Sequence, residues 1–285
     1  MRDIQLHINL PFSWWLKRDP STGTPLVPPT DRLLSAYTEA LKREISSLGA
    51  DMEDCNITDI HFTGGYMSLL QPDDFDAMMA CIHRSFHLAE APRVSGVLFP
   101  GSIDMALASC YKNYSISALM FEVPSLLPRE AQRYHLPLTL NALQHSAYLM
   151  ENFGMNGLGL RIPAGVPERD DAMRAFIVSE LRRFRPCAVE LMPWPYGGDP
   201  TDREALACVL TAAGLSEQTP VFFHGNSGPF AFAEGLAGRV EVIAAGLGAI
   251  SRADGYVTRN TQDMRLYLAN SSDYRNILTS VQEYP

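Results

Sequence analysis

Apolar and polar residues alternate with a period of two near the N-terminus, which is the pattern of a β-strand with two different faces. Leu6 and Ile8 lie on one face, His7 and Asn9 lie on the other, and Pro11 ends the strand. Similar short stretches predict further strands along the chain. The predicted strands are residues 4–10, 59–63, 94–100, 116–125, 156–165, 187–192, 220–224 and 240–244.

Helical patterns fill most of the segments between these strands. Leu34, Leu41 and Ile45 belong to one apolar stripe at helical spacing, and Thr30 is placed to cap the N-terminus of that helix. The predicted helices are residues 31–48, 72–86, 103–110, 138–153, 168–184 and 202–213. Strands that alternate with helices predict the α/β class, with parallel strands joined by right-handed crossovers.

Composition and charge narrow the class of protein. The chain has 285 residues, of which 46% are hydrophobic and 19% charged, so it is expected to form one globular domain over residues 1–285. The net charge of −9 argues against nucleic acid or an anionic membrane as a partner. No apolar run is long enough to span a bilayer, and the N-terminus lacks the features of a signal peptide. We therefore expect a cytoplasmic protein.

The five cysteines lie far apart and form no C-x-x-C pair. This spacing gives no local zinc or cluster motif and no disulfide framework. Cys81, Cys110 and Cys208 fall in helical patterns among apolar neighbours, where free cysteines usually behave as small buried hydrophobes.

The segment IQLHINLPFSWWLKRDP, residues 4–20, resembles the first strand and cluster loop of the radical-SAM coproporphyrinogen III oxidases (HemN- and HemW-like). In that family the segment is L-Y-I-H-I-P-F-C-x-x-x-C-x-x-C, and the three cysteines hold a [4Fe–4S] cluster. Ser13, Lys17 and Pro20 stand at these positions here, and none supplies the thiolate that such a cluster needs. The resemblance therefore indicates a degenerate member without a [4Fe–4S] cluster. Trp14 and Trp15 either plug the cluster space or stack on a flat ligand.

Three further motifs resemble parts of the same family. GGYMSLL resembles G-G-G-T-P-S-L-L, whose glycines approach the amino group of S-adenosylmethionine (SAM); RYH resembles G-R-x-H, whose arginine meets an anionic group of SAM; and GLGAIS resembles G-x-G-A-H-S. The residues expected to bind the cofactor are Gly64, Gly65, Tyr66, Arg133, Arg161, Gly246 and Gly248. The glycine pair is also compatible with a tight turn, and Arg133 with a surface arginine at a helix end.

Other positions depart from the family. Val97, Pro124 and Gly159 replace polar family residues, which counts against SAM in its usual pose. The resemblance implies a partial or open TIM-type (β/α) barrel with its site at the C-terminal ends of parallel strands. The C-terminal helical domain of the full-length oxidases is not expected, since the chain given ends at Pro285.

The alternation along the strands predicts which polar residues face the barrel interior. His7 and His61 lie on adjacent strands, and Glu122, Arg161 and Glu190 lie among apolar neighbours on later strands. His7, His61 and Glu122 are candidate catalytic residues, either as acid and base groups or as a two-histidine, one-carboxylate metal site. Alternatively, Glu122, Arg161 and Glu190 form a buried ion network and the histidines are hydrogen-bonded in the core.

Three functions remain open at this point. In the first, a HemN-like protein without the cluster binds SAM or an anionic tetrapyrrole such as heme at a repurposed site. In the second, the protein is a non-catalytic subunit that pairs with an active enzyme or with a second copy of itself. In the third, it is a non-radical SAM-dependent transferase or lyase that uses the polar barrel mouth.

Overall fold

A computed structural model describes residues 1–19, 22–116, 118–137, 140–218, 221–223, 230 and 232–283, apart from the side chains of 218, 221–223 and 236. The chain divides into two compact units, which are described separately. Unit 1 comprises Met1–Gly96 and Gly238–Pro285, and unit 2 comprises Val97–Ala237. The single domain expected over the whole chain stays a prediction.

The sheet of unit 1 has parallel strands around β1 and antiparallel strands at one edge. Its strands follow the order β12-β11-β10-β9-β1-β2-β3. β1 pairs in parallel with β2 and β9, whereas β10 pairs antiparallel with β9 and β11, and β11 with β12. The strands are β1 (Arg2–Leu10), β2 (Cys55–Gly64), β3 (His87–Leu98), β9 (Val242–Ala245), β10 (Ile250–Ala253), β11 (Tyr256–Asn260) and β12 (Leu278–Glu283).

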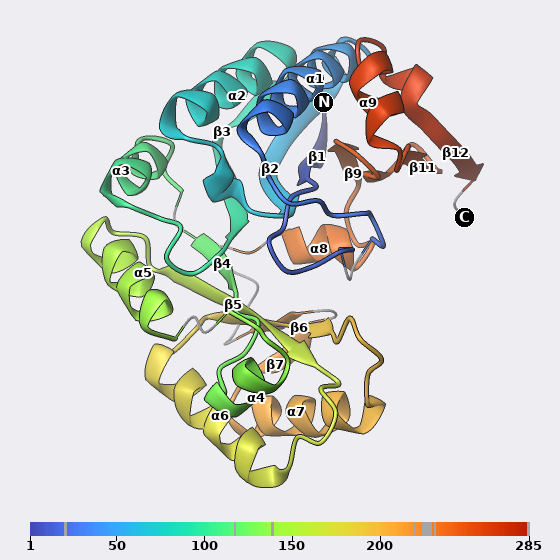
Figure 1. Cartoon of the computed structure of the whole chain (residues 1–285). Coiled ribbons are helices and arrows are strands. Elements are labelled where there is room, and N and C mark those ends of the chain that lie inside the picture. Colours follow the sequence, from blue (N-terminus) through green and yellow to red (C-terminus); the bar gives the residue numbers. More distant parts are fainter. Residues whose placement is uncertain are drawn as a thin grey trace. The chain divides into compact units, whose positions relative to one another are not determined.

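Helices α1 and α2 lie side by side in unit 1 (Figure 1). The Thr30 hydroxyl accepts the backbone N–H of Leu33, which confirms the predicted cap of α1. The predicted apolar stripe is also confirmed at Leu41 and Ile45, which are fully buried. The helices and 3₁₀ turns of unit 1 are α1 (Asp31–Ala50), η1 (Met67–Leu69), α2 (Pro72–Ser85), α9 (Met264–Asn270) and η2 (Tyr274–Ile277).

Unit 2 is built on three parallel strands with an antiparallel addition. β5 pairs in parallel with β4 and β6, and β8 runs antiparallel to both β6 and β7. The strands are β4 (Ala118–Glu122), β5 (Gly157–Ala164), β6 (Ala188–Pro193), β7 (Ser216–Gln218) and β8 (Val221–Phe223). The helices are α3 (Met105–Asn113), α4 (Pro128–Arg133), α5 (Leu140–Asn152), α6 (Asp171–Phe184), α7 (Pro200–Ala212) and α8 (Phe232–Leu236).

The differences from the predicted elements concern short segments. The strand predicted at 220–224 is β8, which is antiparallel instead of parallel, and residues 220 and 224 lie outside the described residues. The sequence analysis does not predict the strands β7, β10, β11 and β12 or the helices α4, α8 and α9. None of these seven is longer than seven residues, too short for a period to be recognised.

Cysteine burial follows the prediction in part. Cys81 and Cys110 are buried, but Cys208 is exposed, because it lies on the outer face of α7. Among the described residues, no helix combines the length and apolar character needed to cross a membrane.

Candidate functional site

A row of polar side chains crosses three neighbouring strands of unit 1. His7 on β1 is in register with His61 on β2, and His61 with Ser95 on β3. The two imidazole rings lie edge to face with their centroids 5.5 Å apart. His61 Nδ1 is 2.9 Å from Ser95 Oγ, and His7 Nε2 is 3.1 Å from Gln5 Oε1. The structure therefore confirms that the two histidines are neighbours and are hydrogen-bonded in the core.

His7 is a neutral imidazole at physiological pH. Its burial, together with the charge of Arg252, lowers its pKa to about 4. The Gln5 amide oxygen can only accept a hydrogen bond, so His7 Nε2 carries the proton and Nδ1 keeps its lone pair. His7 is thus in the protonation state of a base.

The glycine pair after β2 is explained by close packing. A Cβ atom at Gly64 would overlap the side-chain oxygen of Asn9, and one at Gly65 would overlap the carbonyl oxygen of Phe12. Gly64 also has a φ of +83°, which favours glycine. The glycine pair therefore brings the end of β2 against the segment that follows β1.

The loop after β1 closes on Tyr66. Trp14 stacks on the Tyr66 ring at a centroid distance of 5.0 Å, and Trp15 Nε1 donates to the Tyr66 hydroxyl at 3.1 Å. Ser13 Oγ lies 3.3 Å from the same hydroxyl and accepts the N–H of Leu16 at 3.1 Å. Tyr66 is fully buried between these groups. These contacts support the interpretation that the tryptophans fill space in this loop.

The residues at the cluster positions do not fit a [4Fe–4S] cluster. Ser13 offers a hydroxyl that is already engaged with Tyr66, and Lys17 offers an exposed ammonium. Neither can act as a thiolate ligand. Pro20, at the third position, lies outside the described residues. No chemical step through a cluster is therefore derived for this chain.

Gly246 and Gly248 are likewise packing positions. Their φ values are +113° and +66°, in the region that favours glycine. A Cβ at Gly246 would overlap the Asn9 carbonyl oxygen, and one at Gly248 would overlap the hydroxyl of Thr24. The two glycines thus allow the segment after β9 to pack closely against Asn9 and Thr24.

Unit 2 carries a second polar row, and this one is charged. Glu122, Arg161 and Glu190 are in register on β4, β5 and β6. Arg161 Nη1 lies 3.2 Å from Glu122 Oε2, and Arg161 Nε lies 2.8 Å from Glu190 Oε2. All three side chains are buried, which confirms the predicted ion network. Arg161 thus lies between two buried carboxylates.

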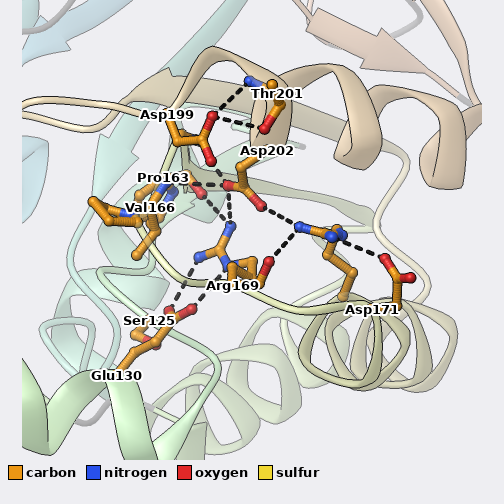
Figure 2. A network of polar contacts seen from close by, with 12 residues as sticks. Ser125, Glu130, Pro163, Val166, Arg169, Asp171, Asp199, Thr201 and Asp202 are labelled. Atoms are coloured by element: carbon orange, nitrogen blue, oxygen red, sulfur yellow. Dashed lines mark hydrogen bonds and ion pairs between the residues drawn. The ribbon is translucent and has the colours of Figure 1, made fainter.

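A second ion network lies at the carboxyl ends of the parallel strands of unit 2 (Figure 2). Arg169 Nε is 2.8 Å from Glu130 Oε1, and Arg169 Nη1 is 3.0 Å from Asp202 Oδ2. Arg174 Nη1 reaches the other oxygen of Asp202 at 3.2 Å. Arg169, Glu130 and Asp202 are almost completely buried. Arg169 and Arg174 thus pair with the two buried carboxylates, and Arg174 also pairs with the exposed Asp171 at 2.8 Å.

The same network fixes the backbone of the surrounding loops. Asp202 Oδ2 accepts the N–H groups of Gly165 at 2.8 Å and Val166 at 3.1 Å, just after β5. Ser125, after β4, donates to Glu130 Oε2 at 2.8 Å. Asp202 lies in the first turn of α7. The network thus ties the segments after two strands to the start of a helix.

Sequence reasoning missed Glu130, Arg169 and Asp202, which look like solvated charges near helix ends. The available signal was their position, since each follows one of the parallel strands within a short distance along the chain. Carboxyl ends of parallel strands lie at one edge of a sheet, which brings such residues together.

Arg133 lies on the surface of unit 2. Its guanidinium forms a two-pronged ion pair with Glu168, with Nη2 at 2.7 Å from Oε1. Both side chains are more than half exposed. This placement agrees with a surface arginine near the end of α4, and its contact with SAM stays a prediction.

The candidate catalytic residues belong to different units. His7 and His61 lie in unit 1, whereas Glu122 pairs with Arg161 in unit 2. Within the described part of the chain, no group of three or more His, Cys, Asp or Glu side chains is arranged to hold a metal ion.

Comparison with known proteins identifies the fold. No protein-family model and no curated protein matches the sequence. Among solved structures, the chain is similar to coproporphyrinogen III oxidase (HemN) from Escherichia coli, a radical SAM enzyme, with a TM-score of 0.84 and 15% identity over 100% of this chain and 72% of that one.

The chain is also similar to two structures of anSMEcpe, one with a hexahistidine tag and one native with Cp18Cys peptide, both with bound AdoMet. Their TM-scores are 0.50 and 0.52, at 10% and 11% identity, over 96% and 97% of this chain and 80% and 82% of theirs. At these identities the likeness concerns the fold alone. The predicted class is confirmed: the chain has the α/β fold of coproporphyrinogen III oxidase and other radical-SAM enzymes, a partial TIM-type barrel of mostly parallel strands.

Proposed function

We propose that this protein uses a radical-SAM fold to bind SAM or a closely related organic cation, without cluster-dependent chemistry. The observation that carries the proposal is the pair of buried carboxylates Glu122 and Glu190, which lie in register on either side of Arg161. Buried carboxylates favour a positively charged group beside them over a negatively charged one.

The sign of the ligand's charge distinguishes the two ligand classes that the family resemblance suggests, SAM and tetrapyrroles. SAM carries a positive sulfonium and a positive ammonium against one carboxylate. A tetrapyrrole such as heme carries negative propionate groups, which the two carboxylates would repel. The row therefore favours SAM over a tetrapyrrole. The AdoMet bound to anSMEcpe, a protein of similar fold, supports the same choice.

The chemistry proposed for this protein is non-radical. The residues at the cluster positions are not thiolates, so nothing in the chain's cluster loop would supply an electron to SAM. His7 is a neutral imidazole whose Nδ1 lone pair can accept a hydrogen bond from a ligand. A non-radical transferase or lyase is the enzyme class proposed.

A specific observation favours a second candidate, a non-catalytic subunit. Trp14, Trp15 and Ser13 all contact Tyr66 and fill the loop that resembles the cluster loop. A scaffold that keeps its fold while its chemical loop is closed by aromatic side chains is expected for a subunit that supports another protein. The partner would be an active homologue or a second copy of this chain.

Calorimetric titration of the purified protein with SAM, S-adenosylhomocysteine and hemin separates these candidates. S-adenosylhomocysteine lacks the sulfonium charge, so we expect SAM to bind at least tenfold more tightly. Tight binding of hemin with no binding of SAM would contradict the proposal and favour a tetrapyrrole carrier. Failure of all three to bind would contradict it in favour of the subunit.

A further inference from the structure

Unit 1 contains a pocket of about 270 Å³ that is separate from the polar row of His7 and His61. It lies between α1 and the strands β9 to β12. This volume is near the lower limit for small-molecule sites. Its apolar lining consists of Leu48, Met52, Ile243, Ala244, Ala253, Leu278 and Val281.

Glu44 lines this pocket. Its side chain is almost fully buried, whereas Tyr256 and Val281, which also line the pocket, are about half exposed. A buried carboxylate in a pocket with a partly apolar lining is the kind of polar group that fixes the orientation of a ligand.

Among the described residues, the hydrogen bonds to Glu44 come from neutral donors. Gly246 N–H donates to Oε2 at 2.8 Å, Tyr267 O–H donates to Oε2 at 2.6 Å, and Asn260 Nδ2 donates to Oε1 at 2.6 Å. In the part of the chain that the structure describes, no arginine or lysine pairs with Glu44. Burial raises the Glu44 pKa to about 7, which is the expected effect of a missing counter-charge.

The nearby arginines are engaged elsewhere. Arg2 pairs with Asp54, Glu241 and Asp254 at the edge of the pocket. Arg43, the neighbour of Glu44 on α1, donates to the Leu268 carbonyl and the Ser271 hydroxyl. Neither arginine therefore pairs with the Glu44 carboxylate.

We infer that this pocket is a second binding site, for a small organic ammonium compound whose apolar part contacts the lining and whose charge pairs with Glu44. The apolar part of the lining favours a ligand that carries an apolar group as well as a charge. An amine with an apolar group of modest size satisfies both the lining and the carboxylate. This site is independent of the row in unit 2 and of the proposal made for it.

Binding is expected to weaken as the pH falls below about 7, because protonation of Glu44 removes the charge that the ligand pairs with. The other titratable groups around Glu44 do not interfere in this range. Tyr37 on α1 and Tyr267 on α9 have pKa values raised by burial and stay neutral. Asp254, on the pocket wall, is held by Arg2.

The test is calorimetric titration with phenethylammonium, with 2-phenylethanol as a neutral probe of the same shape. We expect the ammonium compound to bind at least tenfold more tightly than the alcohol at pH 8, and its affinity to fall about tenfold between pH 8 and pH 6. Equal affinities for the two probes, no binding at pH 8, or an affinity that does not change with pH would overturn the inference.

Two variants locate the site. Glu44→Gln removes the charge, and Ala253→Phe fills the pocket while leaving the bonds of Glu44 in place. Each is expected to reduce the affinity for phenethylammonium at least tenfold, and the exposed Glu39→Gln on the same helix is the matched control. If Glu44→Gln does not fold, Ala253→Phe decides: unchanged affinity in that variant would contradict the site.

Discussion

The two buried ion systems of unit 2 share one motif, an arginine between two carboxylates, but differ in what they hold. In the network of Figure 2, Arg169 lies between Glu130 and Asp202, and Arg174 pairs with Asp202 and with the exposed Asp171. In the strand row, Arg161 lies between Glu122 and Glu190. The network also holds loop backbone through Asp202. These backbone bonds indicate that the network maintains the fold, whereas the row is the site proposed for the ligand.

Breaking the ion network around Arg169 should have the largest effect on the free energy of unfolding. Glu130→Gln removes one of two carboxylates around the buried Arg169 and leaves an uncompensated positive charge. We expect the free energy of unfolding to fall by about 3 to 5 kcal/mol, measured by urea denaturation. The exposed Glu217→Gln, which breaks a surface pair with Arg203, should cost less than about 1 kcal/mol. Equal losses in the two variants would contradict a structural role for the network.

His7 is a buried group that is neutral at physiological pH, and it should make stability depend on pH. Its pKa is lowered from 6.5 to about 4 in the folded protein, so the unfolded chain binds the proton more readily. The stability that this difference provides is present above pH 6.5 and is lost as the pH falls to 4, a loss of about 3 kcal/mol. Unfolding curves measured at pH 7 and pH 4 should show this loss, and His7→Gln should reduce it. An unchanged pH dependence in that variant would exclude His7 as the cause.

Glu44 should give stability a pH dependence of the opposite sign to that of His7. Its pKa is raised from 4.5 to about 7 by burial, so the folded protein retains a proton that the unfolded chain releases. The resulting stability is present below pH 4.5 and lost as the pH rises through 7, and the loss amounts to about 3 kcal/mol. Glu44→Gln should remove this term from stability measured between pH 5 and pH 8, whereas Glu39→Gln should keep it. If Glu44→Gln still loses the full stability between pH 5 and pH 8, Glu44 is not the group that causes the loss.

Removing one carboxylate of the row should affect stability least. Glu190→Gln leaves Arg161 paired with Glu122 and removes one negative charge. We expect the free energy of unfolding without ligand to change by less than about 1 kcal/mol, because the lost attraction to Arg161 is offset by the lower cost of burying a neutral amide. A loss as large as that of Glu130→Gln would show that the row, too, maintains the fold.

The alternation of residues along the strands was enough to predict much of this arrangement. It placed His7 beside His61 and put Arg161 with Glu122 and Glu190, because parallel strands in register bring corresponding positions together. The resemblance in short motifs predicted the radical-SAM fold, which the likeness to HemN confirms.

What the sequence could not predict depends on loop conformation. The network around Arg169 forms only when the segments after β4 and β5 and the start of α7 meet, and no local pattern determines that meeting. Similarly, the pairing of Arg133 with Glu168 joins residues 35 positions apart. The glycine motifs matched the family in sequence, but their close contacts with Asn9 and Phe12 became visible only in three dimensions.

The most direct test of the central claim is the ratio of dissociation constants for SAM and S-adenosylhomocysteine, measured by calorimetry in the wild type and in Glu190→Gln. The account predicts a wild-type preference of at least tenfold for SAM that falls several-fold in the variant, because the sulfonium then faces one carboxylate fewer. Glu217→Gln should keep the full preference. An identical ratio in wild type and Glu190→Gln would contradict the claim that the charge of the row selects a cation.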